Sequence, residues 1–184
     1  MVEFLLTNEY PVKEPKFDFP ANAGIDGFIP SNTKEFRDRL FEKNPSLFAT
    51  DNTRSDQIDE STFNVDTGEF VIAPHASILI PSGLYMKIPS DSALIDFNKS
   101  GIATKKRLVV GACIIDYSYQ GIIHYHIINT SDEYQVVKCD EKIMQMVEVK
   151  IGNGATVYKN LSPEEFFTEK SSRGDGGFGS TGLL

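Results

Sequence analysis

The sequence predicts an all-β domain of the sandwich or barrel kind that carries one polar insertion. From Glu69 onward, short runs rich in Val, Ile, Leu, Tyr and Phe are broken by Pro and Gly. The breaks recur at roughly eight-residue intervals, a spacing typical of sandwiches and barrels. No repeated alternation of strand and helix patterns is present, so a parallel α/β sheet is not expected.

Composition narrows the class of protein. The 184 residues suit one domain, and 40% apolar with 24% charged residues is ordinary for a globular chain. No N-terminal basic segment precedes an apolar run, and no stretch approaches ~18 apolar residues, so neither secretion nor a membrane span is expected. A net charge of −8 argues against a nucleic-acid partner. It would also repel a free nucleotide unless a divalent cation accompanied it.

The two cysteines, Cys113 and Cys139, form no disulfide framework and have no Cys or His partners at zinc spacing. We expect both to serve in packing. A reducing, cytoplasmic compartment is the simpler interpretation.

The stretch NAGIDGFIP, from Asn22 to Pro30, places small residues around a single acid, Asp26. This pattern predicts a tight, closely packed corner. The Asp26 carboxylate either caps local backbone N–H groups or belongs to a polar network near a site.

Residues 31–67 are polar and charged, unlike the rest of the chain. Within them, NTKEFRDRLFEKNP predicts a short amphipathic helix that begins after Asn32 as N-cap and stops at Asn44-Pro45. Phe36 and Leu40 would share its apolar face. The remainder predicts a long surface loop, and loops of that length are uncommon unless they are functional or disordered. We therefore treat 31–67 as an insertion.

The β-rich run leads into FNKSGIATKKR. Lys99, Ser100 and Gly101 combine a cation, a hydroxyl and a permissive backbone at a predicted helix start. These are the features of a phosphate cradle, although the combination also arises often by chance. Earlier in the run, His75 stands in a turn and is expected to be a surface residue.

Residues 108–129 read LVVGACIIDYSYQGIIHYHIIN, in which two apolar runs flank DYSYQG. This pattern predicts a β-hairpin with Asp116 to Gly121 at or near its turn. Because both runs are apolar at nearly every position, we expect burial on both faces, one of them against other subunits. Asp116 either caps the turn or acts as a general base, with Tyr119 nearby to position a substrate.

His124 and His126 fall two apart in the second run. No other His or Cys stands at ligand spacing, so we do not expect a metal site there. The following EYQVVKCDEKIMQMVEVKI predicts two more strands. Gln145 stands alone among apolar neighbours there, and either faces solvent or makes one specific hydrogen bond.

The last residues, RGDGGFGSTGLL from Arg173 to Leu184, contain five glycines and too few apolar side chains for a core. Glycines let backbone N–H groups approach an anion, Arg173 offers a planar fork of donors, and Phe178 is free to lie on a heterocycle. Ser180 and Thr181 add hydroxyl donors. The segment predicts a lid over a nucleotide polyphosphate, with a solvated tail as the alternative.

Together, these stretches resemble the trimeric dUTPases, a family marked by five short motifs in fixed order. The motifs correspond here to Ala23–Asp26, Asn98–Ala103, Gly111–Gly121, Asp140–Met146 and Arg173–Gly182. They run from residue 21 to the C-terminus apart from the insertion, and the fifth is the most specific. The resemblance implies a jelly-roll-like β-sandwich subunit, residues 1–172, with a C-terminal lid, residues 173–184. It also implies a homotrimer with active sites at the subunit interfaces.

The resemblance implies hydrolysis of dUTP to dUMP and pyrophosphate. Asp116 would bind the deoxyribose 3′-hydroxyl and polarise the water that attacks the α-phosphorus. Tyr119 would pack on the sugar, and backbone groups around Cys113 to Ile115 would read uracil. Mg²⁺ would be held mainly by triphosphate oxygens and waters rather than by the protein. Asp26 would support the site without touching substrate. The remaining substrate-binding residues would be Lys99, Ser100, Gly101, Gln145, Arg173, Phe178, Gly179, Ser180 and Thr181.

The chain departs from the family pattern at several positions, which suits a divergent viral or phage lineage. Lys99 and Lys142 stand where arginine is common, Asn98 replaces a usual proline, Cys113 a usual glycine and Ser118 a usual acid. Two other functions stay open. One is a dCTP deaminase of the same fold, which needs a glutamate at the base. The other is a trimeric protein-binding module that uses the 31–67 insertion.

Overall fold

The computed structural model describes residues 2–19, 22–45, 63–152, 159–167, 169 and 171. Contacts divide the chain into two units, residues 1–152 and 153–184. In the second unit the described residues include one short helix, α3 (Pro163–Phe166), with a capping box between Ser162 and Glu165. The predicted lid, with its Arg173, Phe178, Gly179, Ser180 and Thr181, lies outside the described residues. None of the helices in the described ranges is long and apolar enough to span a membrane.

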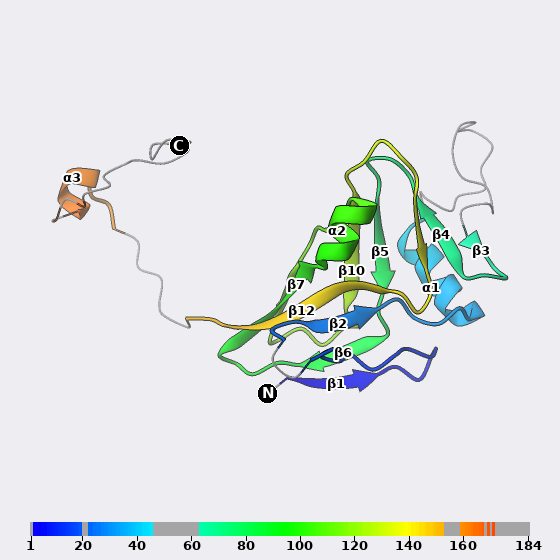
Figure 1. Cartoon of the computed structure of the whole chain (residues 1–184). Helices are drawn as coiled ribbons and strands as arrows, with labels where there is room; N and C mark the ends of the chain where they lie inside the picture. The colour runs from blue at the N-terminus through cyan, green and yellow to red at the C-terminus, as the bar shows by residue number, and fades with distance from the viewer. Residues whose placement is uncertain are drawn as a thin grey trace. The chain divides into compact units, whose positions relative to one another are not determined.

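The first unit is built from antiparallel strands in four small sheets (Figure 1). One sheet pairs β1 (Glu3–Leu6) with β6 (Leu84–Lys87). The order in the second is β5 (Ser77–Pro81), β10 (His124–Asn129), β8 (Leu108–Val110). In the third it is β11 (Gln135–Lys138), β4 (Glu69–Ile72), β3 (Phe63–Asn64). The fourth runs β2 (Ile25–Phe28), β12 (Lys142–Lys150), β7 (Ser92–Asn98), β9 (Ile114–Asp116). Two helices, α1 (Lys34–Lys43) and α2 (Ser100–Lys106), complete this unit among the described residues.

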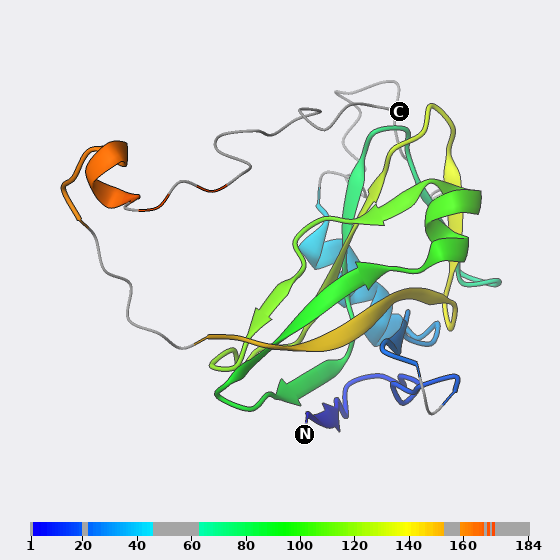
Figure 2. The same ribbon diagram turned by 60° about the vertical axis from the view of Figure 1, so that its left-hand side comes forward.

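The all-β prediction is confirmed, and the predicted breaks fall where strands end. At the β5–β6 turn, Gly83 has a φ of 73°, which a side chain rarely adopts. A Cβ there would also lie 2.8 Å from Cε2 of Tyr10, so a glycine is required on both counts. The two strands predicted after residue 133 are β11 and β12, and Figure 2 shows β12 beside β7 along the unit.

The core lies between the sheets and draws on nearly all of them. Burial of such apolar surface stabilises the fold by about 25 cal/mol per Å² removed from water. Cys139 is part of this core, as predicted, whereas Cys113 is half-buried. The largest fully buried side chains of the core are those of Tyr125, Phe36, Phe70, Ile29, Leu40, Ile72, Ile78, Ile80, Leu84, Leu94, Leu108 and Ile123.

The first part of the insertion belongs to this core. Helix α1 ends at Lys43 with Asn44 as C-cap, as predicted, but its N-cap is Thr33, whose hydroxyl accepts from Phe36 N. The predicted N-cap, Asn32, is wrong by one residue because its side chain accepts from Arg37 and donates to Val65 O instead.

Both ends of the segment 31–67 are anchored by buried side chains. Phe36 and Leu40 share the buried face of α1, as predicted. The Asn44 amide donates to Leu79 O and accepts from Leu79 N, which ties the helix end to β5. At the other end, Phe63 stacks on Phe70 with ring centroids 5.5 Å apart. The predicted loop between these anchors, residues 46–62, lies outside the described residues.

The predicted hairpin over residues 108–129 is wrong in its pairing. β8 does pair with β10, but β9 pairs with β7 in a different sheet. The chain therefore switches sheets over residues 110–113, from the last residue of β8 to the residue before β9. Apolar residues at nearly every position could not reveal the switch because both sheets accept them. Ile114 is 67% exposed in the single chain. The burial of one face against other subunits stays a prediction.

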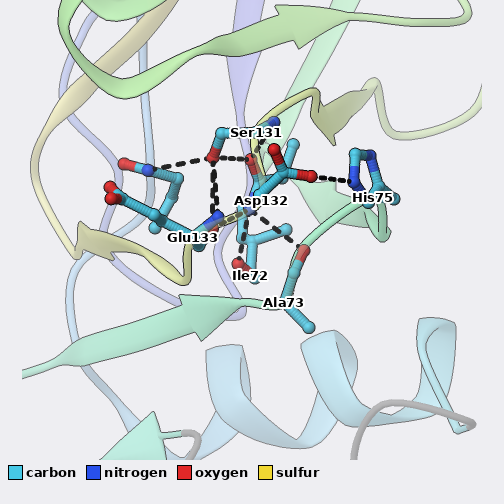
Figure 3. Close-up of polar contacts among 8 residues, drawn as sticks. Ile72, Ala73, His75, Ser131, Asp132 and Glu133 are labelled. Atoms are coloured by element: carbon cyan, nitrogen blue, oxygen red, sulfur yellow. Dashed lines mark hydrogen bonds and ion pairs between the residues drawn. The ribbon is translucent and has the colours of Figure 1, made fainter.

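A polar cluster fixes the turns at one end of β10 (Figure 3). The amide of Asn129 donates to backbone carbonyls of Ile72, Ala73 and Glu133, and its oxygen accepts from Ser131. Close by, the His75 ring lies 2.8 Å from Asp132 Oδ1 on the surface, which confirms the exposed histidine. The cluster ties the β4–β5 turn to the β10–β11 turn.

Candidate active site

Residues from three distant stretches meet at one end of the four-stranded sheet. In the register of this sheet, Gln145 of β12 stands opposite Asp26 of β2 on one side and Phe97 of β7 on the other. Lys99 follows β7 directly as the N-cap of α2, which starts at Ser100 as predicted. Strand pairing therefore gathers the first, second and fourth motifs.

Asp26 is the centre of a charge network at this end. Its side chain is 4% exposed, with Lys99 Nζ 2.6 Å from Oδ1 and Lys142 Nζ 2.8 Å from Oδ2. Lys142 also pairs with the carboxylate of Asp18. Hydrogen bonds to Asp18 and then to Asp26 raise the pKa of Lys142. A buried carboxylate is stable only with such partners, so Asp26 belongs to a polar network.

Gln145, which stands opposite Asp26 in the sheet, is held by a hydrogen bond and by close packing. Its Nε2 donates to the backbone oxygen of Asn98 at 3.0 Å, so of the two alternatives left by the sequence, exposure to solvent or one specific hydrogen bond, the structure shows the hydrogen bond. A Cβ on Gly24 would lie 2.3 Å from Gln145 Oε1, so a larger residue there would displace the glutamine. The tight corner predicted around Asp26 is thus confirmed. Ser100 is exposed, and a Cβ on Gly101 would meet open space.

A second cluster lies at the end of β9. Asp116 is the last residue of the strand and is exposed, and its backbone oxygen accepts from Tyr119 N at 3.0 Å. The Tyr119 hydroxyl donates to Ile122 O, and a Cβ on Gly121 would lie 2.5 Å from that hydroxyl. Gly121 thus lets the Tyr119 ring fold back against the backbone beside Asp116.

The two clusters do not meet within one chain. Asp116 stands opposite Ala93 of β7, six positions before Lys99. At about 3.3 Å per residue, this separates the two backbone positions by roughly 20 Å along the strand direction. The structure therefore brings Asp26, Lys99 and Gln145 together and holds Asp116 and Tyr119 apart from them.

Between the clusters, the backbone predicted to read a base is held in place. Ile115 pairs with Leu94, and the Cys113 oxygen accepts from Asp96 N at 2.8 Å. Of the two histidines of β10, His124 has its pKa lowered by burial, and His126 accepts a hydrogen bond from Ala112 N at Nδ1. In the ranges that the structure describes, no group of three or more His, Cys, Asp or Glu could hold a metal ion.

The chain matches the model of a known protein family. The model of the dUTPase family matches residues 65–182, which is more than half of the chain. The chain belongs to the dUTPase family. Motifs two to five of the dUTPase pattern lie inside the matched range, whereas Asp26 and most of the insertion precede it.

Individual dUTPases agree with this assignment. A deoxyuridine 5′-triphosphate nucleotidohydrolase of Neisseria meningitidis is 41% identical over 119 residues, 62% of this chain and 75% of the relative. One from the fungus Eremothecium gossypii is 34% identical over 115 residues, 62% of this chain and 67% of the relative.

Solved dUTPase structures share the fold. A point mutant of the dUTPase of Staphylococcus bacteriophage 80alpha, solved with dUpNHpp, superposes with a TM-score of 0.68 and 18% identity, covering 100% of this chain and 99% of that one. The native dUTPase of EIAV gives 0.56 and 15% identity, with 88% of this chain and 98% of that one covered. The jelly-roll-like β fold predicted for the chain is confirmed.

The sequence alone does not reveal the contacts of three residues near the two clusters. Asp18 pairs with Lys142 across 124 positions, a distance over which no local pattern is visible. His126 stands out in the sequence only as one of two histidines at possible metal-ligand spacing. Asn98 departs from the usual proline, and that departure is the available signal, because its Oδ1 accepts from Val110 N at 2.7 Å.

Proposed function

We propose that this chain hydrolyses dUTP to dUMP and pyrophosphate as a magnesium-dependent homotrimer, with Asp116 as the general base. The observation that carries the assignment of the base is the contrast between the two motif aspartates. Asp26 is buried and held by two lysines, whereas Asp116 is exposed and enters no ion pair among the described residues. Asp116 is therefore the carboxylate that is available to a substrate.

In the proposed reaction, a water oxygen bonds to the α-phosphorus while Asp116 accepts the water's proton. The bond from the α-phosphorus to the bridging oxygen breaks, and pyrophosphate leaves with the electron pair. Tyr119 packs on the deoxyribose, where its ring leaves no room for a 2′-hydroxyl. Backbone groups from Cys113 to Ile115 bind the edge of uracil.

The phosphates belong at the other cluster, where two ammonium groups are gathered. Lys99 and Lys142 lie beside the carboxylates of Asp26 and Asp18, so the four formal charges cancel in the free protein. A phosphate oxygen would accept charge-assisted hydrogen bonds from these ammonium groups in competition with the carboxylates. Ser100, Gly101 and Gln145 lie next to them. The lid residues Arg173, Phe178, Gly179, Ser180 and Thr181 close over the γ-phosphate and the base.

Magnesium fits this arrangement when it arrives on the substrate. The Asp26 carboxylate is already neutralised by two lysines, so a cation would have to compete for it. Mg²⁺ prefers phosphate oxygens and its own waters to dedicated protein cages. When bound, it neutralises charge on the triphosphate, which an acidic chain would otherwise repel.

The separation of the clusters favours sites made by more than one subunit. Roughly 20 Å along β7 is too far for Asp116 and Lys99 to act on neighbouring groups of one triphosphate. The exposed apolar side chains of Ile114 and Phe97, 67% and 45% exposed, lie on the paired strands β9 and β7. Contact between subunits would bury such a face. A homotrimer supplies both the contact and the second cluster.

Pyrophosphate release with Mg²⁺ tests the proposal on dUTP, dTTP, dCTP and UTP at equal concentration. We expect strong selectivity for dUTP and loss of turnover in Asp116→Asn. The matched control is Asp132→Asn, which changes another exposed aspartate. Equal release from all four nucleotides, or full turnover in Asp116→Asn, would refute the proposal, and ammonia release from dCTP would replace it with deamination.

A further inference from the structure

The segment Val110–Cys113 crosses from one sheet to another. It leaves β8, which pairs with β10, and enters β9, which pairs with β7. Where a strand changes sheets, its backbone N–H groups leave the hydrogen-bonded ladder and need other partners. We call residues 110–113 the crossover.

Two side chains act as acceptors for the crossover. Val110 N donates to Asn98 Oδ1 at 2.7 Å, and Ala112 N donates to His126 Nδ1 at 2.9 Å. Backbone bonds hold the residues between and after them: Gly111 N donates to His126 O, and Cys113 O accepts from Asp96 N, both at 2.8 Å. The crossover is therefore fastened at four successive residues.

The His126 ring is packed against the crossover as well as bonded to it. A Cβ on Gly111 would lie 2.2 Å from His126 Nδ1 and 2.9 Å from Cδ1 of Ile128. Only glycine admits the ring at this distance. Because Nδ1 accepts from an amide, the ring proton of neutral His126 belongs on Nε2.

We propose that His126 and Asn98 are positioning residues that set the backbone of Cys113–Ile115 and thereby the discrimination of uracil from other bases. The proposal rests on the proposed function, in which that backbone reads the base. Hydrogen bonds weaken steeply with angle and distance, so a rotation of the Ala112 peptide would misplace the Cys113 donors and acceptors. A proline at position 98 has no side-chain acceptor, so this anchor depends on the residue that this chain carries there.

The test compares variants that remove an acceptor with one that keeps it. His126→Ala and Asn98→Ala delete the acceptors of Ala112 and Val110. His126→Asn retains an oxygen near the place of Nδ1. His75→Asn is the matched control, because His75 is exposed at a distant turn and asparagine tolerates its left-handed backbone.

Three readouts apply to each variant: amide hydrogen exchange by NMR, kcat and KM for dUTP and dCTP, and binding of dUMP and dCMP. We expect His126→Ala to speed exchange at Ala112 about tenfold, as for loss of one hydrogen bond. The KM for dUTP should rise about tenfold, while kcat stays within about threefold of the wild-type value. The ratio of kcat/KM for dUTP to that for dCTP should fall. Asn98→Ala should speed exchange at Val110, and His126→Asn should stay near wild type in every readout.

Several outcomes would overturn the proposal. If amide exchange at Ala112 is unchanged in His126→Ala, the hydrogen bond to His126 does not hold the crossover in place. Faster exchange with an unchanged preference for uracil would show that the anchor does not govern base recognition. An equal loss for every nucleotide together with a lower melting temperature would mark a merely structural role. A wild-type protein that does not hydrolyse dUTP would refute the proposed function separately, and selective dUMP binding that narrows in His126→Ala would still support the positioning role.

Discussion

Three aspartates in the same four-stranded sheet differ in what surrounds them, and their surroundings assign their roles. Asp26 is buried between two lysines, Asp116 is exposed at a strand end, and Asp96 is buried with Oδ1 unbonded to any described partner. Asp26 holds two lysine ammonium groups in place, and Asp116 can contact a substrate. Burial raises the pKa of Asp96 to about 8. Residue type alone therefore says little about chemistry in this sheet.

Among substitutions of these three aspartates, the largest effect is expected for Asp116→Asn, on the rate of hydrolysis. Asp116→Asn removes the proposed base, so kcat should fall by about 10² to 10⁴, the usual contribution of general-base catalysis. Because the side chain is exposed, the urea unfolding midpoint should stay unchanged. Pyrophosphate release and unfolding are measured on the same preparation. A drop in stability that matches the loss of rate would contradict the separation of roles.

Asp26→Asn should show the opposite pattern, with stability affected first. The change leaves Lys99 and Lys142 without their shared carboxylate, and removal of one partner from a buried pair costs about 3 kcal/mol or more. Partial exposure of the lysines reduces this cost. Urea unfolding at fixed protein concentration measures it, because subunit association adds to stability. A variant as stable as wild type would show that the network is not structural.

Asp96 should make the stability of the fold depend on pH. Its pKa is raised from 3.8 to about 8 by burial, so the folded protein keeps a proton that the unfolded chain releases. This proton makes its full contribution to the free energy of unfolding below about pH 4. The contribution is lost as the pH rises toward and through 8, with a slope of at most about 1.4 kcal/mol per pH unit. Asp96→Asn should abolish this loss, which is measured as urea unfolding between pH 7 and 8. His124, whose pKa is lowered, titrates below this window. Parallel curves for both proteins would disprove the assignment.

The sequence was sufficient for features that local patterns determine. Strand positions after Glu69, the buried face of α1 and the end of that helix at Asn44 follow from periodicity and breaking residues. The prediction of a helix start at Lys99 and Ser100 was correct for the same reason. These features depend on neighbours within a few positions, which is the range over which propensities act.

Features that depend on pairing between distant segments escaped prediction. The apolar run predicts a hairpin strand where the crossover at 110–113 lies, because either sheet accepts apolar residues. The acceptor roles of Asn98 and His126 exist only once that crossover is placed. Separation of Asp116 from Lys99 likewise depends on the register of β7 with β9. The parts of the site that are fixed by topology therefore needed the structure.

The smallest expected effect concerns Asp18, the outermost member of the Asp26 network. A hydrogen bond from Lys142 lowers the pKa of Asp18, and the same ammonium group would bind a phosphate. Asp18→Asn should free Lys142 for substrate and lower the KM for dUTP about twofold, with kcat and the unfolding midpoint unchanged. Asp91→Asn, which loosens an exposed pair with Lys150 elsewhere, is the control. Because added salt screens exposed charges, the difference between Asp18→Asn and wild type should shrink at high ionic strength. A raised KM would instead mean that Asp18 holds Lys142 in its productive position, and would extend the structural role of Asp26 to its neighbour.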